Sequence, residues 1–236
     1  MIPKSHPRYI SLRTRDLIVD GVKKGITSTH GLIAHGRGEA FDYLIKEKTS
    51  SSSKKAIKAA AALLLLAKHP IISVNGNSAA LAPKEIVKLS KLIPAKIEIN
   101  IFHASKQREK KIKNHLTKHG AKQILLPKKP LIKHINHNRR FCNPEGIYKA
   151  DVIFVPLEDG DRCEALRNMG KRVITIDLNP LSRTAKKANI TIIDNIVRAL
   201  PLLTNQIRTL KKYNKKQLKN LLKNYHNKVV LKKAIS

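Results

Sequence analysis

The sequence is poor in the residues on which several classes of protein depend. Its 236 residues include no tryptophan, 4% aromatic residues and only two cysteines. Cys142 and Cys163 have neither CxxC nor zinc-ligand spacing, which argues against a disulfide framework and against metal binding by sulfur, and is typical of a reducing cytosol. The shortage of aromatic rings also leaves few surfaces on which nucleic-acid bases could stack.

Long apolar runs and common catalytic signatures are missing too. The longest apolar run, residues 59–67, lies between Lys58 and Lys68 and is far shorter than the ~20 residues of a membrane-spanning helix. We expect a buried helix there and no membrane partner. The N-terminal MIPKSHPRYI has no apolar signal-peptide region, so we expect a cytoplasmic location. No GxGxxG, Walker A, HExxH or GxSxG motif occurs, which argues against NAD binding, P-loop ATP hydrolysis, a zinc site and a nucleophilic serine.

Acidic residues are scarce: 16 Asp and Glu stand against 48 Lys and Arg, a formal net charge of +32. Such an excess makes nucleic acid, anionic membranes and phosphorylated small molecules the first partners to consider. Most of the cations are lysines, which genomic or solubility bias can explain, so the arginines are more informative. Several arginines adjoin glycines or turns, where a guanidinium can bind phosphate or carboxylate through two hydrogen bonds. They are Arg37, Arg139, Arg140, Arg162 and Arg183.

The hydrophobic pattern changes near residue 70. Before it, helix formers without β-branched runs predict helices. After it, short β-branched runs alternate with amphipathic segments, as in a parallel sheet with helical crossovers. The expected helices are 16–26, 30–36, 39–48, 51–69, 83–92, 105–119, 161–169, 181–188 and 195–210. The expected strands are 71–75, 96–102, 123–126, 151–156, 172–177 and 190–193. Residues 127–146, rich in Pro, His, Asn and Lys, predict a long functional loop or an insert.

We therefore predict an α/β protein with a parallel, Rossmann-like sheet flanked by helices, an N-terminal helical portion and a basic helical C-terminal extension. Residues 1–70 would form the helical portion, integrated with a core of residues 71–201, and residues 202–236 the tail. The tail contains no acidic residue. A docked or solvated amphipathic helix is the more ordinary interpretation of the tail, and an RNA- or membrane-binding arm is the alternative.

Polar residues follow five of the expected strands. They are residues 75–77, His103, 158–162, 177–180 and 194–195. The carboxyl ends of parallel strands share one edge of a sheet, so these residues predict a ligand crevice, although each alone is ordinary turn chemistry. Two glycines around Arg37 in HGRGE could offer backbone N–H groups to an anion or could form a flexible corner. Asp159 and Asp161 could ligate magnesium or cap a helix.

Several long strings together resemble the archaeal 4-phosphopantoate–β-alanine ligases, or phosphopantothenate synthetases. They cover residues 8–49, 69–81, 135–140, 143–162 and 173–201. The resemblance implies a magnesium-dependent homodimer that makes 4-phosphopantothenate, a coenzyme A precursor, from 4-phosphopantoate, β-alanine and ATP, with release of AMP and pyrophosphate. It also implies the ATP contacts, namely Arg15, Arg37, Asp177, Leu178, Asn179, Arg183, Thr184, Asn195 and Ile196.

Activation of a carboxylate by adenylation requires no enzyme nucleophile, which agrees with the missing catalytic triads, but it requires cations around two phosphorylated substrates. We expect Arg15, Arg37 and Arg183 to neutralise phosphate charge. From the strand-end argument alone, we expect Asn75, Gly76, Asn77 and His103 to lie near 4-phosphopantoate or the reacting carboxylate. The rival hypothesis is a non-enzymatic RNA- or DNA-binding protein that uses the basic surface and tail, whereas the ligase hypothesis requires no nucleic acid.

Overall fold

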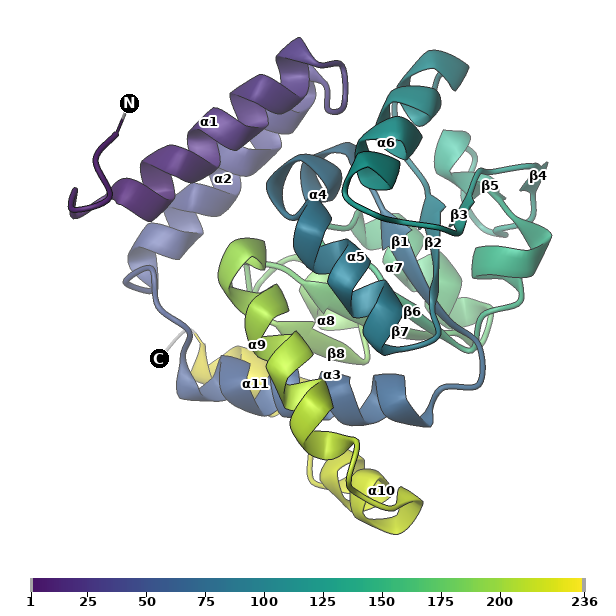
Figure 1. Cartoon of the computed structure of the whole chain (residues 1–236). Helices are drawn as coiled ribbons and strands as arrows, with labels where there is room; N and C mark the ends of the chain where they lie inside the picture. Colours follow the sequence, from purple (N-terminus) through teal and green to yellow (C-terminus); the bar gives the residue numbers. More distant parts are fainter. Residues whose placement is uncertain (1, 235–236) are drawn as a thin grey trace.

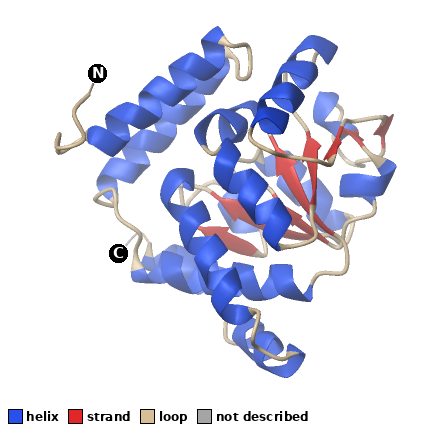
Figure 2. Ribbon diagram, viewed as in Figure 1, coloured by secondary structure: helices blue, strands red, loops and turns tan. Residues whose placement is uncertain are grey.

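The computed structural model describes residues 2–234, so the first residue of the predicted helical portion and the last two of the predicted tail lie outside the described residues. Its strands form a main sheet with helices on both faces (Figures 1 and 2). The strands of the main sheet are β1 (Pro70–Val74), β2 (Lys96–Ile99), β3 (Ile124–Leu125), β6 (Val152–Phe154), β7 (Arg172–Ile176) and β8 (Ile190–Ile192). The longer helices are α1 (Tyr9–Lys23), α2 (Thr29–Leu44), α3 (Ser51–Leu66), α5 (Pro83–Leu92), α6 (Lys106–Lys118), α7 (Gly160–Asn168), α9 (Ile196–Leu210) and α10 (Lys215–Lys223). The shorter helices are α4 (Gly76–Leu81), α8 (Arg183–Lys187) and α11 (Asn227–Lys233).

All six strands run parallel, in the order β3-β2-β1-β6-β7-β8. The chain thus builds outward from β1 through β2 to β3, then returns to the other side of β1 and continues through β6, β7 and β8. The direction of winding changes between β1 and β6, and such a switch point is where open α/β sheets bind their ligands, at the carboxyl ends of the strands. The predicted fold class is confirmed.

Both faces of the sheet are buried, as β-branched strands without polar alternation predict. Ile72 and Val74 of β1 belong to a hydrophobic core shared with α3, α5 and α9. Ile71 and Ile153 point to the opposite face and pack in a second core with α7. The alternation along each strand therefore fixes the register, because a slip of one residue would exchange the two cores.

Helix α3 is the buried helix expected from the longest apolar run. The Ser50 side chain accepts a hydrogen bond from the Ser53 backbone N–H and caps the helix. Residues 59–64 are buried and pack against α9 and the tail. Within residues 2–234, no helix combines the length and the apolar character needed to cross a bilayer.

The tail helices dock on the body. Leu218 of α10 and Val230 and Leu231 of α11 are buried, and both helices contact α3. The described part of the tail thus agrees with the docked amphipathic helix, and its lysines cover the outer side of an apolar stripe.

Neither alternative for residues 35–39, a flexible corner or a loop that offers backbone N–H groups to an anion, is correct. Residues 29–44 form one continuous helix, α2, which includes Gly36 and Gly38. A glycine inside a helix costs only about 1 kcal/mol relative to alanine, which the good helix formers around the glycines offset. The backbone N–H groups of this segment therefore bond within the helix, so only the Arg37 side chain remains for an anion.

Two other predictions need correction. Helix α4, which directly follows β1, was not expected; its capping box joins Asn75 to Ser78. Residues 127–146 are not one loop, because β4 (Lys129–Pro130) pairs antiparallel with β5 (Phe141–Cys142), next to the helical turn η1 (Asn138–Arg140). A second helical turn, η2 (Pro144–Tyr148), follows.

Glu98 on β2 holds η2 against the sheet. Its carboxylate accepts hydrogen bonds from the backbone N–H groups of Asn143, at 2.8 Å, and Ile147, at 2.7 Å. Gly146 is required beside it, since a Cβ there would lie 1.9 Å from Glu98 Oε2. Burial raises the pKa of Glu98 to about 7, although the two backbone donors oppose the change.

We expect this carboxyl group to make stability depend on pH. Between pH 4.5 and about 7 the folded chain retains a proton on Glu98 that the unfolded chain has lost, so the free energy of unfolding falls as the pH rises. The decrease from this group should reach about 3 kcal/mol. Urea denaturation across this range should show the effect in the wild type but not in Glu98→Gln, which cannot titrate there. If the free energy of unfolding changed with pH in the same way in both proteins, the prediction would be contradicted.

Candidate active site

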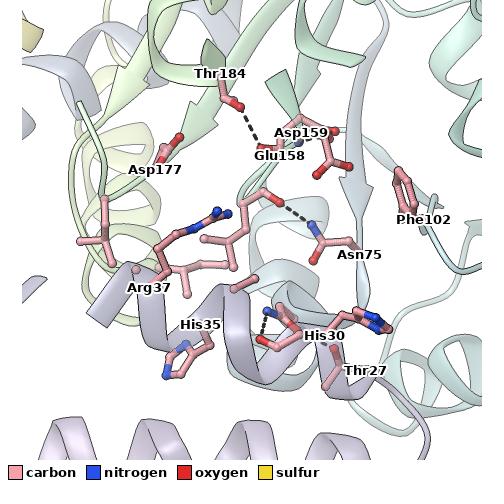
Figure 3. Close-up of a pocket in the computed structure, with 18 of the residues that line it drawn as sticks. Thr27, His30, His35, Arg37, Asn75, Phe102, Glu158, Asp159, Asp177 and Thr184 are labelled. Atoms are coloured by element: carbon pink, nitrogen blue, oxygen red, sulfur yellow. Dashed lines mark hydrogen bonds between the residues drawn. The ribbon is translucent and has the colours of Figure 1, made fainter. Parts of the chain in front are cut away.

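A cavity of about 700 Å³ lies at the carboxyl edge of the sheet, beside the switch point, with α2 forming the opposite wall (Figure 3). All five of the polar strand ends contribute to its lining. The lining also includes all but one of the residues predicted for the site. These are Arg37, Asn75, His103, Asp177, Leu178, Asn179, Arg183, Thr184, Asn195 and Ile196.

Arg15 is the predicted residue that the structure does not bring to the cavity wall. It lies on α1, and its guanidinium Nε is 2.8 Å from Glu39 Oε1 on α2. The pair is partly solvent-exposed, where such an interaction contributes little to stability. In this arrangement Arg15 helps to pair the two helices of the α1–α2 hairpin.

Arg37 extends from α2 toward Asp177 at one side of the cavity (Figure 3). In residues 2–234 its guanidinium has neither a hydrogen bond nor an ion pair within 4.0 Å. Asp177 is partly buried, and this desolvation raises the pKa of its carboxyl group, while hydrogen bonds from Ser182 and the Asn179 backbone and the charge of Arg37 oppose the change. Arg37 is therefore a cation free to meet an anionic ligand.

Arg183 also lines the cavity, but it already has a partner. Its Nη2 lies 2.5 Å from Glu164 Oε2, and Lys187 binds the other oxygen of the same carboxylate. The Arg183 stem crosses Gly160, where a Cβ would lie 2.6 Å from Arg183 Cβ. An exchange of Glu164 for a ligand would cost Arg183 little, because this pair is partly exposed.

Asn75 sits at the switch point itself. Its Nδ2 donates to the carbonyl oxygens of Leu157, at 2.8 Å, and Pro156, at 3.2 Å, and its Oδ1 accepts from the Ser78 N–H. The amide thus bridges the ends of β1 and β6 and caps α4. Because its polar atoms are engaged within the protein, its geometry is that of a residue that shapes the cavity.

Thr184 and Asn195 are engaged in the same way. The Thr184 hydroxyl donates to the Glu158 carbonyl at 2.8 Å, and Asn195 Nδ2 donates to Asp42 Oδ2 at 2.9 Å. These contacts align the start of α8 and the start of α9 along one side of the cavity.

Helix α2 is fixed to the body at both ends. Near its start, Asn77 accepts a hydrogen bond from Thr27 and donates one to the Gly31 carbonyl. Near its end, the Arg198 guanidinium binds both Asp42, at 2.5 Å, and Asp194, at 2.7 Å. The wall that carries Arg37 is therefore held in place by polar contacts from β1–α4 and α9.

A buried charge network underlies the cavity floor. Glu158 lies between two arginines, with Arg139 Nη1 2.8 Å from its Oε1 and Arg162 Nη1 bound to its Oε2. The side chains of Glu158 and Arg162 are 0% exposed. Burial disfavours the charge of Arg139, but Glu158 and Asp159 together raise its pKa above the ordinary value. This network was partly predictable from the sequence, because Arg139 and Arg162 both adjoin turns.

Three side chains at the other end of the cavity were not assigned from the sequence to a common site. The rings of His30 and His103 stack with centroids 4.6 Å apart, and Arg108 donates to the His103 carbonyl at 2.6 Å. Phe102 packs edge-on against His103. His30 and Arg108 come from α2 and α6, so no strand-end rule could find them.

The two metal candidates differ in position. Asp159 lines the cavity, and its carboxylate is 45% exposed while one oxygen binds Arg139. Asp161 is bound to His137 at 2.8 Å and does not belong to the lining. Among the described residues no cluster of three or more His, Cys, Asp or Glu side chains is arranged to hold a metal ion. Asp159 could supply the one carboxylate that magnesium needs when phosphate oxygens complete its ligands.

The arrangement suits a reaction between anionic molecules without a covalent enzyme intermediate. Arg37 and Arg108, which have no acidic partner within residues 2–234, both line the cavity, whereas the carboxylates of Glu158, Asp159 and Asp177 are bound to protein donors. Such preorganised donors stabilise charge that develops on phosphate or carboxylate oxygens.

Comparison with known proteins gives one consistent family. Residues 52–236 match the family model described as phosphopantothenate/pantothenate synthetase. The chain is 50% identical over 228 residues to a 4-phosphopantoate–β-alanine ligase of Thermococcus kodakarensis, which covers 96% of this chain and 87% of the relative. It is 52% identical over 235 residues to the enzyme of the same name from Methanosarcina mazei, with 100% of this chain and 93% of the relative covered.

Proposed function

The chain belongs to the phosphopantothenate/pantothenate synthetase family and is a ligase, and we propose that it joins 4-phosphopantoate to β-alanine with ATP to give 4-phosphopantothenate, AMP and pyrophosphate. Its role is in coenzyme A biosynthesis. The observation that supports this assignment most directly is the cavity at the switch point, which is lined both by Arg37, a cation without a partner among the described residues, and by the strand ends of β7 and β8.

ATP is proposed to occupy the side of the cavity lined by Arg37 and the turns after β7 and β8. Arg37 and, after release from Glu164, Arg183 would neutralise its phosphates. Asp177, Leu178, Asn179, Thr184, Asn195 and Ile196 would form the surrounding wall. Arg15 keeps the ATP role that the family resemblance implies only as a prediction, because its guanidinium lies on α1 against Glu39.

The proposed reaction has two steps. In the first, a carboxylate oxygen of 4-phosphopantoate attacks the α-phosphorus of ATP, a P–O bond forms, and pyrophosphate leaves. In the second, the amine of β-alanine attacks the acyl carbon, the C–N bond forms, a proton is lost, and AMP leaves. The protein contributes position and charge stabilisation, since AMP already serves as the leaving group.

Magnesium is proposed to enter with ATP as part of the substrate. The half-exposed Asp159 carboxylate fits a cation shared with phosphate oxygens, and bound magnesium would neutralise phosphate charge. We also propose a homodimer. The α1–α2 hairpin supports it, because Ile10, Ile33, Tyr43 and Leu44 are each more than half exposed there, as is typical of an association surface.

The test is a reaction mixture of the protein, ATP, magnesium, 4-phosphopantoate and β-alanine, with AMP as the readout. We expect AMP release that stops when any one component is omitted. Exchange of pyrophosphate into ATP should need 4-phosphopantoate but not β-alanine, as the order of the two steps requires. Tight RNA binding that falls steeply with salt, together with no AMP release, would instead support the nucleic-acid-binding hypothesis, and deletion of residues 203–236 should then abolish that binding.

A further inference from the structure

The end of α2 is joined to the body through a buried cluster of three charged side chains. Arg198 on α9 spans two carboxylates. Its Nε and Nη2 lie 2.9 and 2.7 Å from Asp194 Oδ1, just after β8, and its Nη2 and Nη1 lie 2.5 and 3.1 Å from the two oxygens of Asp42 on α2. We call Asp42, Asp194 and Arg198 the carboxylate clamp. None of the three lines the cavity.

The residues next to the clamp in the chain do line the cavity. Arg37 and Phe41 precede Asp42 on α2, and Asn195 and Ile196 lie between the other two members of the clamp. Asp42 also accepts a hydrogen bond from Asn195 Nδ2 at 2.9 Å. The clamp therefore joins two walls of the cavity, one on α2 and one at the start of α9, from behind.

Charge rather than apolar packing holds this end of α2. Among the residues of α2, all of which the structure describes, Asp42 alone is buried, and the neighbouring Tyr43 and Leu44 are 72% and 75% exposed. Thr49, in the linker that follows α2, donates to the second oxygen of Asp194 at 2.6 Å. Buried ion pairs of this kind add little net stability for their desolvation cost, but their directional bonds can specify one geometry.

We propose that the carboxylate clamp is a positioning device for adenylation, in which Arg198 sets the placement of Arg37 against the turn after β8 without touching a substrate. The inference rests on the proposed function and assigns a role to residues outside the cavity. A guanidinium stabilises developing charge only when it is correctly placed, and a displacement of about 1 Å can lower a rate about 100-fold. Loss of the clamp should therefore lower the rate of the chemical step more than the affinity for substrates.

The first experiment measures exchange of pyrophosphate into ATP, with 4-phosphopantoate present, in variants of the clamp. Arg198→Met removes the charge and should lower the kcat of exchange about 100-fold. Arg198→Lys keeps the charge but cannot span two carboxylates with one planar group, so it should recover about 10-fold of that loss. The KM for 4-phosphopantoate should stay within about threefold of the wild type, because Asn77 anchors the start of α2 separately.

Two further variants keep the test sharp. Asp42→Asn breaks the same contact from the side of α2 and should lower the kcat about 10-fold, as Arg198→Lys does. Arg208→Met is the matched control, because Arg208 is an exposed cation on the same helix as Arg198 and lies outside the cavity lining. Its exchange rate should equal that of the wild type.

A double-mutant cycle with Arg37 separates positioning from a general loss of structure. If Arg198 acts by placing Arg37, Arg198→Lys should change the residual exchange rate of Arg37→Ala less than about twofold, although it costs about 10-fold when Arg37 is present. A purely structural role of Arg198 would lower the rate by the same factor in both backgrounds.

The outcomes separate the two proposals. If the wild type neither exchanges pyrophosphate nor releases AMP, the proposed function itself is wrong. If the wild type is active and the Arg198 and Asp42 variants retain its kcat, or if Arg198→Lys costs the same factor with and without Arg37, the clamp does not position Arg37. Loss of folding in Arg198→Met alone leaves the cycle to decide, whereas unfolding of all three clamp variants would show a role in stability and overturn the inference.

Discussion

Arg37→Ala should lower the rate of adenylate formation about 1,000-fold, the loss typical of removing a preorganised donor from developing transition-state charge. Arg37 is the guanidinium that lines the side of the cavity proposed for ATP and has no protein partner among residues 2–234. Exchange of labelled pyrophosphate into ATP, with 4-phosphopantoate present, measures this step directly. Thermal unfolding should hardly change, because the exposed side chain makes no intramolecular polar contact within the described structure.

Arg13→Ala is the matched control for this substitution. Arg13 lies on α1, the other helix of the hairpin, and is exposed and outside the cavity lining. The Arg13→Ala substitution removes the same charge without changing the site, so the rate of pyrophosphate exchange in this variant should equal that of the wild type. Wild-type exchange in Arg37→Ala, or equal losses in both variants, would show that Arg37 has no specific role in the chemistry.

Glu158→Leu should have the largest effect on stability. It leaves Arg139 and Arg162 buried and facing each other without the carboxylate that separates them. Breaking such a buried pair from one side costs about 3–5 kcal/mol of the free energy of unfolding, which chemical denaturation would measure. The variant should also lose activity, because the Glu158 carboxylate positions Arg139 behind Asp159.

Glu164→Leu tests whether burial of the charges causes the loss of stability expected for Glu158→Leu. Glu164 also binds two basic side chains, Arg183 and Lys187, but both partners are about half exposed or more. Its removal should leave the free energy of unfolding nearly unchanged, because solvent already screens the pair. Similar losses of stability in the two variants would contradict an account based on desolvation.

The site residues at the carboxyl edge of the sheet could be predicted, because the geometry of this edge follows from the local sequence pattern. Once β-branched runs indicated parallel strands, the residues after β1, β6, β7 and β8 had to meet, and Asn75, Glu158, Asp177 and Asn195 do line one cavity. The prediction needed no knowledge of how helices pack. It depended only on strand direction, which the alternation of strands and helices indicates strongly.

The opposite wall could not be predicted in this way. Arg198 and Asp42 are separated by 156 positions in sequence, and nothing in the local pattern of either residue indicates the other. Arg108 resembles any other cation of the lysine-rich α6 until the helix is placed beside the turn at Ile26. The HGRGE segment was misinterpreted for a different reason. Its two glycines suggested a break between two helices, whereas the neighbouring residues maintain one continuous helix.

The division of the cavity between two stretches of chain has a consequence for how specificity can evolve. The wall with His30 and Arg37 belongs to the α1–α2 hairpin, which ends before the segment 52–236 that the family model matches. One crossover in the linker between α2 and α3 would thus exchange a whole side of the cavity between relatives and leave the sheet intact. Chimeric enzymes joined at this linker offer a way to transfer substrate preference as a unit, without a search through scattered point substitutions.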